Sequence, residues 1–332
     1  MFRVLLFISL AASLHADDAL QRFAYEKAEM GLPFRITLYA PDAAAAKAAA
    51  DAAFERIAQL NGVFSDYDSD SELSRLSRTS GTDRFVPVTT DLWNVLERAQ
   101  ALALRTDGAF DITIGPLVSL WRRARQKKEL PGADIIAEMK ERVGWHNLLL
   151  DPATKSAKLL VPDMRLDVAA IAKGYAIDAA AKLLRERGVT RSLVAGGGDM
   201  MAGDPPPGQP GWKIEVAPLD APDSPAAEVV LLRNSAIATS GDIFQRVEIG
   251  GVRYSHIVDQ QTGLGLTDHS LVTILAPDCT TADSLSTAVS ALRPRLGLKL
   301  VEETPGIAAR IVRKPADRVE VRTSARWPEQ AR

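Results

Sequence analysis

Residues 166–178 place an acid and a lysine in an otherwise small and apolar stretch. The acid is Asp167 and the lysine is Lys173. A buried charge without a partner costs several kcal/mol, so Lys173 needs either a carboxylate of the chain or an anionic ligand. A surface helix that keeps both charges in water explains the same pattern, and structural ion pairs also resemble it. The stretch alone leaves these interpretations open.

Asp283 and Thr287 form a second pair of oxygen donors, one helical turn apart. Helical spacing sets them opposite an apolar stripe, whose members are Leu285, Ala288, Val289 and Leu292. Carboxylate and hydroxyl oxygens are ligands that Mg²⁺ accepts. A polar face in contact with water is the commoner cause of such a pair, and the spacing alone favours it.

Three consecutive glycines, residues 196–198, precede Asp199 and follow a predicted strand. Glycine allows close approach of a ligand to the backbone, but a tight turn at the end of a strand explains the run equally well. The run has neither the G-x-G-x-x-G spacing nor the lysine of a P-loop, so the common phosphate-binding motifs are excluded here.

His256 ends an alternating segment that leads into a turn at residues 262–263. A histidine in that position could act as a general base or contact a phosphate. A hydrogen-bonded structural histidine is the commoner alternative.

The elements that position these residues follow from hydrophobic periodicity. Helices are predicted over residues 42–61, where Gly62 is expected to end the helix, and over residues 90–105 and 167–187. A fourth helix is expected to begin with a threonine cap near Thr280 and to end at Pro294. Strands are predicted at 34–38, 148–150, 192–195, 212–216, 228–232 and 271–276, with an edge strand at 319–321.

Charge and composition exclude some classes of partner. The 332 residues include 40 basic and 42 acidic side chains, for a net charge of −2, so nucleic acid is not an expected partner. Cys279 is the only cysteine, so the chain can form no internal disulfide.

The first 16 residues have the pattern of a secretory signal peptide, with Arg3 before an apolar run. The run is about half of the roughly 20 residues that a membrane-spanning helix needs, so no permanent span is expected. Cleavage after Ala16 leaves no cysteine there for a lipid anchor. The sequence therefore predicts a soluble periplasmic protein with a mature domain of residues 17–332.

Five groups of segments, in chain order, resemble the FAD:protein FMN transferases, also called the ApbE family. They are Met30-Gly31, residues 64–67 with 71–75, residues 108–117 with Trp121, residues 166–178 with 197–199, and finally residues 238–242, 256–263 and 282–287. Each group is a weak signal alone, but the five groups in this order are a specific one. Together they span nearly the whole mature chain. The chain departs from the family at Leu32, where the family has threonine, and at Gln260-Gln261, where it has Pro-Arg. The missing arginine puts a contact to the flavin-side phosphate or to the acceptor in question.

The resemblance implies a two-lobed α+β fold of layered mixed sheets and packed helices, related to the T-fold. It implies that the backbone carbonyl of Ala170, together with Asp283 and Thr287, holds Mg²⁺. The helix face that carries Asp283 and Thr287 would then be a metal site and not a polar face in contact with water. The residues that match the FAD site are Met30, Tyr67, Ala109, Phe110, Asp111, Asp167, Lys173 and Ile257. Tyr67 and Phe110 would supply stacking or packing surfaces.

The implied reaction is transfer of FMN from FAD to a threonine hydroxyl of another exported protein, with AMP as the leaving group. Lys173 would contact the phosphates or the leaving group, and His256 is the candidate to accept the hydroxyl proton. Two alternatives use the same pocket: Mg²⁺-dependent hydrolysis of FAD, and flavin binding without catalysis. Release of AMP separates catalysis from binding, and FMN bound covalently to an acceptor separates transfer from hydrolysis.

Overall fold

The computed structural model describes residues 20–219, 228–243 and 245–328. The predicted signal peptide, residues 1–16, lies outside the described residues. Within those ranges no helix combines the length and the apolar character needed to cross a bilayer.

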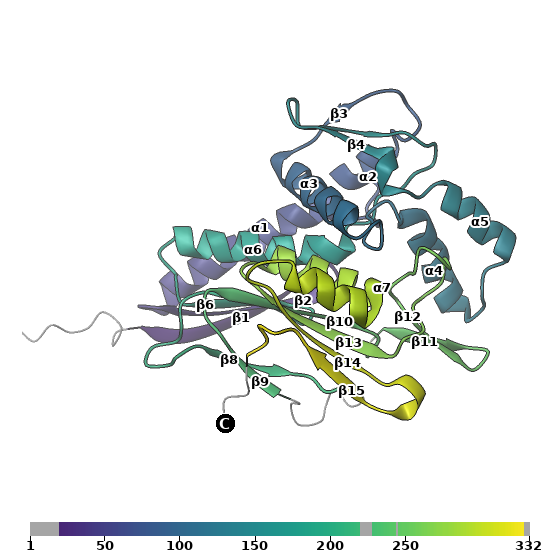
Figure 1. The fold of residues 1–332 in the computed structure, drawn as a ribbon. Coiled ribbons are helices and arrows are strands. Elements are labelled where there is room, and N and C mark those ends of the chain that lie inside the picture. The colour runs from purple at the N-terminus through teal and green to yellow at the C-terminus, as the bar shows by residue number, and fades with distance from the viewer. Residues whose placement is uncertain (1–19, 220–227, 244, 329–332) are drawn as a thin grey trace, which may run out of the picture.

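An antiparallel sheet of eight strands forms the base of the molecule (Figure 1). Its order is β1-β2-β6-β7-β10-β13-β14-β15, and β15 is an edge strand as the sequence predicts. The strands are β1 (Gln21–Glu29), β2 (Leu32–Ala40), β6 (Ser192–Gly196), β7 (Asp199–Ala202), β10 (Ser235–Gly241), β13 (Ser270–Ala276), β14 (Ala308–Arg313) and β15 (Glu320–Thr323).

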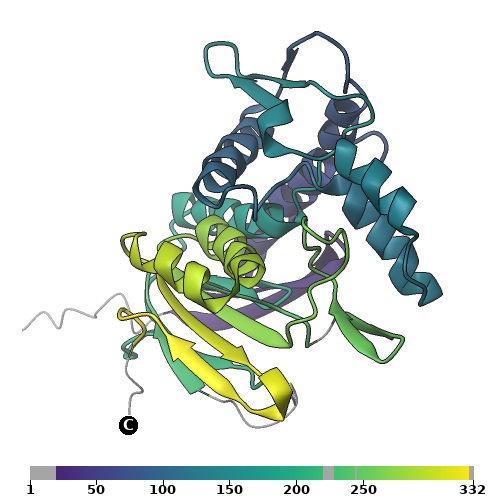
Figure 2. The same ribbon diagram turned by 45° about the vertical axis from the view of Figure 1, so that its right-hand side comes forward.

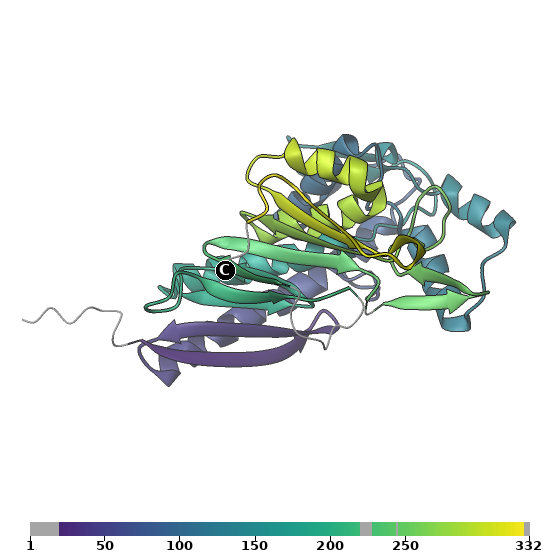
Figure 3. The same cartoon turned by 60° about the horizontal axis from the view of Figure 1, so that its bottom comes forward.

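Three long helices cover one face of this sheet: α1 (Ala43–Phe64), α6 (Ala169–Glu186) and α7 (Cys279–Glu302) (Figure 1). The main hydrophobic core lies between helices and sheet and contains fully buried Phe34, Ile36 and Leu38 of β2. Many of the buried helical residues are alanines, whose small side chains let helices pack closely. The opposite face is covered by the ribbon of β8 (Trp212–Val216) and β9 (Glu228–Leu232), which Figure 3 shows from below.

The second lobe stands beside the helical layer (Figure 2). It consists of α2 (Glu72–Ser77), α3 (Thr90–Arg105), α4 (Gly115–Lys127), α5 (Ala133–Glu141) and a sheet of β3 (Val86–Pro87), β5 (Ser156–Leu159) and β4 (Leu148–Asp151). A separate ribbon, β11 (Arg246–Ile249) with β12 (Val252–Ser255), packs against α4 through Trp121 and Tyr254. The predicted α+β class with two lobes is confirmed.

Two predicted helix ends are wrong. Helix α1 passes Gly62 and continues to Phe64, because burial of Phe64 in the core outweighs the weak helix propensity of a glycine at an open position. Helix α7 does not stop at Pro294 but breaks there, with Arg293 at φ 63°, and resumes to Glu302.

The predicted threonine cap of α7 is also wrong. The cap is Asp278, whose side chain accepts a hydrogen bond from the backbone N–H of Thr281 at 2.8 Å. Aspartate is an equally good cap, and the sequence offered both kinds of side chain within three positions.

Candidate active site

Helices α6 and α7 touch at Gly174. A Cβ atom there would lie 2.3 Å from the backbone oxygen of Cys279 and 2.8 Å from Cβ of Asp283, so only glycine permits this approach. The N–H of Gly174 donates to Oδ2 of Asp283 at 2.9 Å. This contact brings Asp283, which is 2% exposed, into the interior. The face of α7 that carries Asp283 therefore packs against α6 instead of contacting water.

The other two predicted metal ligands lie on the same pair of helices, Ala170 on α6 and Thr287 on α7. Gly174 lies four residues after Ala170 in α6, so its N–H points toward the Ala170 carbonyl. The same N–H donates to the Asp283 carboxylate, and both oxygens therefore lie close to it. Thr287 follows Asp283 by one turn, and its hydroxyl lies 3.2 Å from Oγ of Ser240 in β10. The Ala170 carbonyl and the Asp283 carboxylate thus lie where α6 and α7 meet, and the Thr287 hydroxyl lies where α7 meets β10.

Lys173 finds the anionic partners that its setting requires. Its Nζ lies 2.7 Å from Oδ2 of Asp199 and 3.6 Å from Oδ1 of Asp283. The glycine run turns the chain so that Asp199 starts β7: Gly197 and Gly198 have φ of 57° and 96°. A Cβ at Gly197 would also lie 2.9 Å from Cδ1 of Leu32, so the run supplies both the turn and a close contact.

Asp111, Phe110 and Ala109 lie together after α3. Oδ1 of Asp111 accepts hydrogen bonds from the N–H and the hydroxyl of Thr113, both at 2.7 Å. Its Oδ2 is buried without a hydrogen bond of ordinary geometry among the described residues. Burial raises the pKa of Asp111, and hydrogen bonding to Thr113, Gln260 and Trp145 offsets part of that rise. Phe110 is 3% exposed and belongs to the core, whereas Ala109 is half-buried. Phe110 therefore packs inside the main hydrophobic core.

Tyr67 and Asp167 are connected through Arg122 of α4. The guanidinium carbon of Arg122 lies 4.5 Å from the ring centroid of Tyr67, and its Nη2 lies 2.9 Å from Oδ2 of Asp167. Arg122 also pairs with Asp66. Tyr67 is 80% exposed, so its outer face is open.

His256 directly follows β12. Its N–H donates to the carbonyl of Gln245 at 3.0 Å, and its Nδ1 lies 3.3 Å from the same oxygen. The indole N–H of Trp121 holds the preceding residue through the carbonyl of Ser255, at 2.9 Å. Ile257 is half-buried beside it. Met30 lies in the turn between β1 and β2 with φ 51°.

Comparison with known proteins assigns the fold to one family. The sequence model described as the ApbE family matches residues 30–311, a range that includes every predicted site residue. The chain belongs to the ApbE family. The resemblance inferred from the sequence is thereby confirmed, as is the prediction of a transferase enzyme.

Curated relatives and solved structures agree with ApbE membership. An FAD:protein FMN transferase of Haemophilus influenzae is 33% identical over 251 residues, 74% of this chain and 72% of that protein. The Klebsiella pneumoniae protein of the same name is 29% identical over 92% of this chain and 89% of its own length. The flavin transferase ApbE from Vibrio cholerae superposes with a TM-score of 0.82 at 27% identity, covering 92% of this chain and 98% of that one. The apo form of the flavinyl transferase ApbE from Pseudomonas stutzeri superposes with a TM-score of 0.81 at 29% identity, covering 92% of this chain and 95% of that one.

The charges at the ApbE helix crossing do not balance. Burial lowers the pKa of Lys173, but Asp283 and Asp199 more than offset this effect, so the ammonium stays protonated. Burial, with a further contribution from Asp283, raises the pKa of Asp199 to about 7 in spite of Lys173. When Asp199 is ionised, two buried carboxylates beside one ammonium leave a net negative charge, which a cation would offset.

The donor set fits a hard cation such as Mg²⁺. In the part of the chain that the structure describes, no group of three or more histidine, cysteine, aspartate and glutamate side chains could hold a metal. A metal at the crossing would therefore rely on Asp283 together with hydroxyl and carbonyl oxygens, which suit Mg²⁺ better than softer metals.

The surroundings of His256 also give its imidazole a pKa that differs from that of an ordinary histidine. Burial, the Arg125 guanidinium and the Lys173 ammonium lower the pKa of His256 to about 4. The imidazole is therefore neutral at pH 7. Because the Gln245 carbonyl can only accept a hydrogen bond, Nδ1 carries the proton and the lone pair of Nε2 is available.

Sequence reasoning missed Arg122, Asp199 as the partner of Lys173, and Trp121 as the support of the His256 segment. The partners of Arg122 and Trp121 could not be read from the local sequence, because they lie at least 45 residues away in the chain. Asp199 was visible beside the glycine run, but its pairing with Lys173 depends on the order of β6, β7 and α6.

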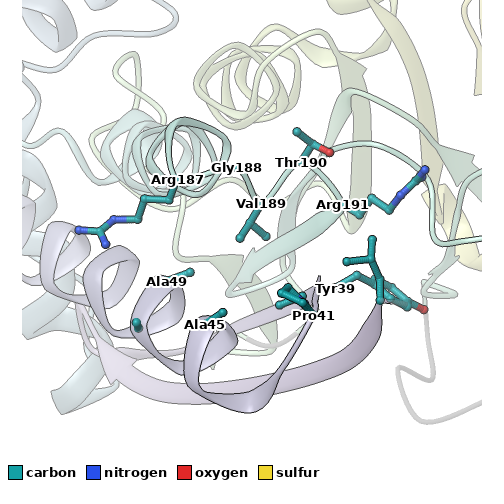
Figure 4. A pocket seen from close by; sticks show the side chains of 12 residues that line it. Tyr39, Pro41, Ala45, Ala49, Arg187, Gly188, Val189, Thr190 and Arg191 are labelled. Carbon is teal, nitrogen blue, oxygen red and sulfur yellow. The ribbon is translucent and has the colours of Figure 1, made fainter. Parts of the chain in front are cut away.

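Two surface hollows lie outside this site. One cavity of about 350 Å³ is bounded by α1 and the turn after α6, with Tyr39, Thr190 and Arg191 on its wall (Figure 4). Another, of about 480 Å³, lies between α6 and β7 and is lined in part by Asp178 and Asp278. Neither is lined by a residue predicted for the ApbE site.

Proposed function

We propose that this chain transfers FMN from FAD to a threonine hydroxyl of an exported acceptor protein, with Mg²⁺ as cofactor and AMP as the released product. The coarse activity, FAD:protein FMN transfer, is the one for which the curated relatives are named. The observation that carries the proposal is the α6–α7 crossing, where the N–H of Gly174 binds Asp283 beside the Lys173 ammonium.

In this proposal the carbonyl of Ala170, the carboxylate of Asp283 and the hydroxyl of Thr287 hold the metal. Bound Mg²⁺ would offset negative charge on the pyrophosphate of FAD. The protein supplies the remaining electrostatic stabilisation through Lys173, whose side chain keeps 21% of its surface exposed and so can approach a phosphate.

The acceptor hydroxyl needs a group that takes up its proton. His256 fits this role because its imidazole is neutral at pH 7 and its Nε2 is free to accept. A bond forms between the threonine oxygen and the FMN-side phosphorus, the bond from that phosphorus to the bridging oxygen breaks, and AMP leaves with that oxygen. Positioning and charge neutralisation supply most of the catalysis in such transfers.

The flavin nucleotide would lie along the residues that line the lobe interface. Tyr67, supported from behind by Arg122, offers an exposed aromatic face for stacking. Asp111 offers its buried Oδ2, which forms no hydrogen bond of ordinary geometry among the described residues, as a hydrogen-bond acceptor. Asp167 keeps Arg122 in place, and the remaining contacts are assigned to Met30, Ala109, Phe110 and Ile257.

We also propose export. Residues 1–16 would be removed as a signal peptide and residues 17–332 would function in the periplasm as one transferase domain. The support is the order of a basic residue, a short apolar run and a small residue at the expected cleavage position. N-terminal sequencing of the protein purified from the periplasmic fraction tests this point.

The function is tested by incubating the mature protein with FAD, Mg²⁺ and a purified exported flavin-domain protein, followed by the intact mass of that acceptor and chromatography of released AMP. The proposal expects one FMN on the acceptor for each AMP. AMP with free FMN and an unmodified acceptor would show hydrolysis, and FAD that binds without release of AMP would show a flavin-binding protein; either result contradicts transfer. His256→Gln is the matched control for carry-over of a contaminating enzyme.

A further inference from the structure

The ribbon β11–β12 projects beside the main sheet (Figures 1 and 2). Its second strand ends at Ser255, directly before His256. Gly250 and Gly251 form its two-residue turn, with φ of 59° and 77°, the conformation that a tight hairpin prefers. The register pairs Ile249 with Val252 and Arg246 with Ser255. The ribbon therefore extends the backbone of the His256 segment away from the site.

Hydrogen-bonded and non-hydrogen-bonded residue pairs alternate along the ribbon, and this alternation shows which backbone groups face away from the partner strand. His256 donates to Gln245 across the ribbon, so these two residues form a hydrogen-bonded pair, and alternate pairs along the ribbon do the same. The N–H and C=O groups of Arg246 and Glu248 then point away from β12. Ser255, the partner of Arg246, confirms this alternation on the other strand, because its N–H donates outward to Leu266 at 2.7 Å.

The two edges of the ribbon differ. The outer side of β12 is covered by the segment around Leu266, whose N–H also donates to the carbonyl of Ile257 at 2.8 Å. On β11, the outward backbone groups of Arg246 and Glu248 have no partner within the described ranges, and both residues are exposed. Among the described residues, β11 is thus an open edge of the ribbon. It begins directly after Gln245, the residue paired with His256.

We propose that the outer edge of β11 binds an extended segment of the acceptor protein as an added antiparallel or parallel strand. This inference rests on the proposed transfer to a protein hydroxyl, which requires a polypeptide to approach His256. An added strand lies about 4.8 Å from β11 and forms main-chain hydrogen bonds with Arg246 and Glu248. Its end near Gln245 would direct a side chain toward the imidazole.

The side chains of β11 define the chemistry of the segment. Val247 and Ile249 are half-buried against the cluster of Trp121 and Tyr254, so the added strand should present small apolar side chains on that face. Arg246 and Glu248 lie on the other face, where the segment should carry an acidic and a basic or polar side chain opposite them. The main-chain bonds give affinity, and these side chains give selectivity.

Glu248→Pro tests the edge, because proline removes the outward N–H and its ring obstructs an added strand, while an edge position tolerates it. Glu248→Ala is the matched control that loses the side chain but keeps the N–H. The probe is the flavin-domain protein that accepts FMN in the transfer assay. The expected result is a KM for this acceptor raised about tenfold in Glu248→Pro, little change in Glu248→Ala, and unchanged affinity for FAD in both.

Hydrogen exchange of the unmodified enzyme provides a second readout that does not depend on how a variant folds. Saturating acceptor should slow amide exchange at Arg246 and Glu248, with no similar change in β15, the exposed edge strand of the main sheet. Unchanged exchange in β11, or an unchanged acceptor KM in Glu248→Pro, overturns the inference. Both results leave the proposed function standing as long as the acceptor gains FMN, whereas an acceptor that gains no FMN refutes the function itself.

Discussion

The backbone N–H of Gly174 donates to the side chain of Asp283 at 2.9 Å, and this bond joins α6 to α7. A helical N–H ordinarily serves its own helix, so its use by a neighbouring carboxylate marks the point where the two helices are closest. Lys173 lies beside it and pairs with both Asp199 and Asp283. The crossing therefore links core packing to the charges of the proposed metal and phosphate site.

Gly174→Ala should destabilise the protein. The added Cβ would overlap the Cys279 carbonyl, which belongs to backbone and cannot rotate away, so α6 and α7 must separate at a cost of about 1–3 kcal/mol in free energy of unfolding. Gly62→Ala is the control in α1, where the Cβ meets nothing within 4 Å and stability should rise by about 0.5–1 kcal/mol. Urea denaturation measures both. Equal changes in the two variants would show that the helices do not meet at Gly174.

Lys173→Met should reduce stability by about 3 kcal/mol at pH 8, because it leaves two buried carboxylates without their cation. Asp199, an acid whose pKa is raised to about 7 in the folded state, binds protons more readily folded than unfolded. Without the ammonium the pKa of Asp199 rises further, so the variant takes up this proton above pH 7 and the deficit should shrink as the pH falls from 8 toward 7. Lys182→Met, on the exposed side of the same helix, should change stability by no more than about 0.5 kcal/mol. A deficit that grows toward acid pH would refute the pairing.

The imidazole of His256 should titrate near pH 4 in the folded protein. Since the ordinary pKa of a histidine is 6.5, the unfolded chain binds more protons at His256 than the folded protein does between pH 4 and 6.5. The contribution of His256 to stability is thus complete above 6.5 and is lost as the pH falls toward 4. Nuclear magnetic resonance of the imidazole, assigned with the His256→Gln variant, measures the value. Titration at the ordinary value would remove the electrostatic basis for its role as a base.

Tyr67→Ala should weaken FAD binding about three- to tenfold without a measurable change in stability, because the ring is exposed and its contacts are with Arg122 and solvent. Tyr67→Phe keeps the aromatic face and serves as the control. Calorimetric titration of both variants with FAD decides the matter. Unchanged affinity in Tyr67→Ala would place the flavin nucleotide elsewhere.

The sequence predicted the elements that periodicity describes. The predicted strand at 212–216 matches β8, and the predicted helix at 90–105 matches α3. One side of each element is buried in a hydrophobic core, so apolar residues recur in its sequence with the period of a strand or a helix. Helix α5 escaped prediction, since it has no fully buried residue and hence a weak apolar stripe.

The candidate site was only partly accessible to local reasoning. The spacing of Asp283 and Thr287 correctly grouped them on one face, but it favoured a solvated face. That face is buried because Gly174, more than 100 residues earlier, lets α6 approach it. Such a contact depends on the tertiary arrangement, and no local pattern near residue 283 encodes it.

The central claim is that Asp283 holds the metal used in FMN transfer, and the Mg²⁺ dependence of acceptor labelling tests it most directly. Asp283→Asn keeps an oxygen for the N–H of Gly174 but removes the negative charge. We expect the parent to label the acceptor at low Mg²⁺ concentration and the variant to need at least about tenfold more Mg²⁺, or to fail entirely. Identical Mg²⁺ dependence in parent and variant, or full labelling by the parent after chelation of divalent metals, would contradict the claim.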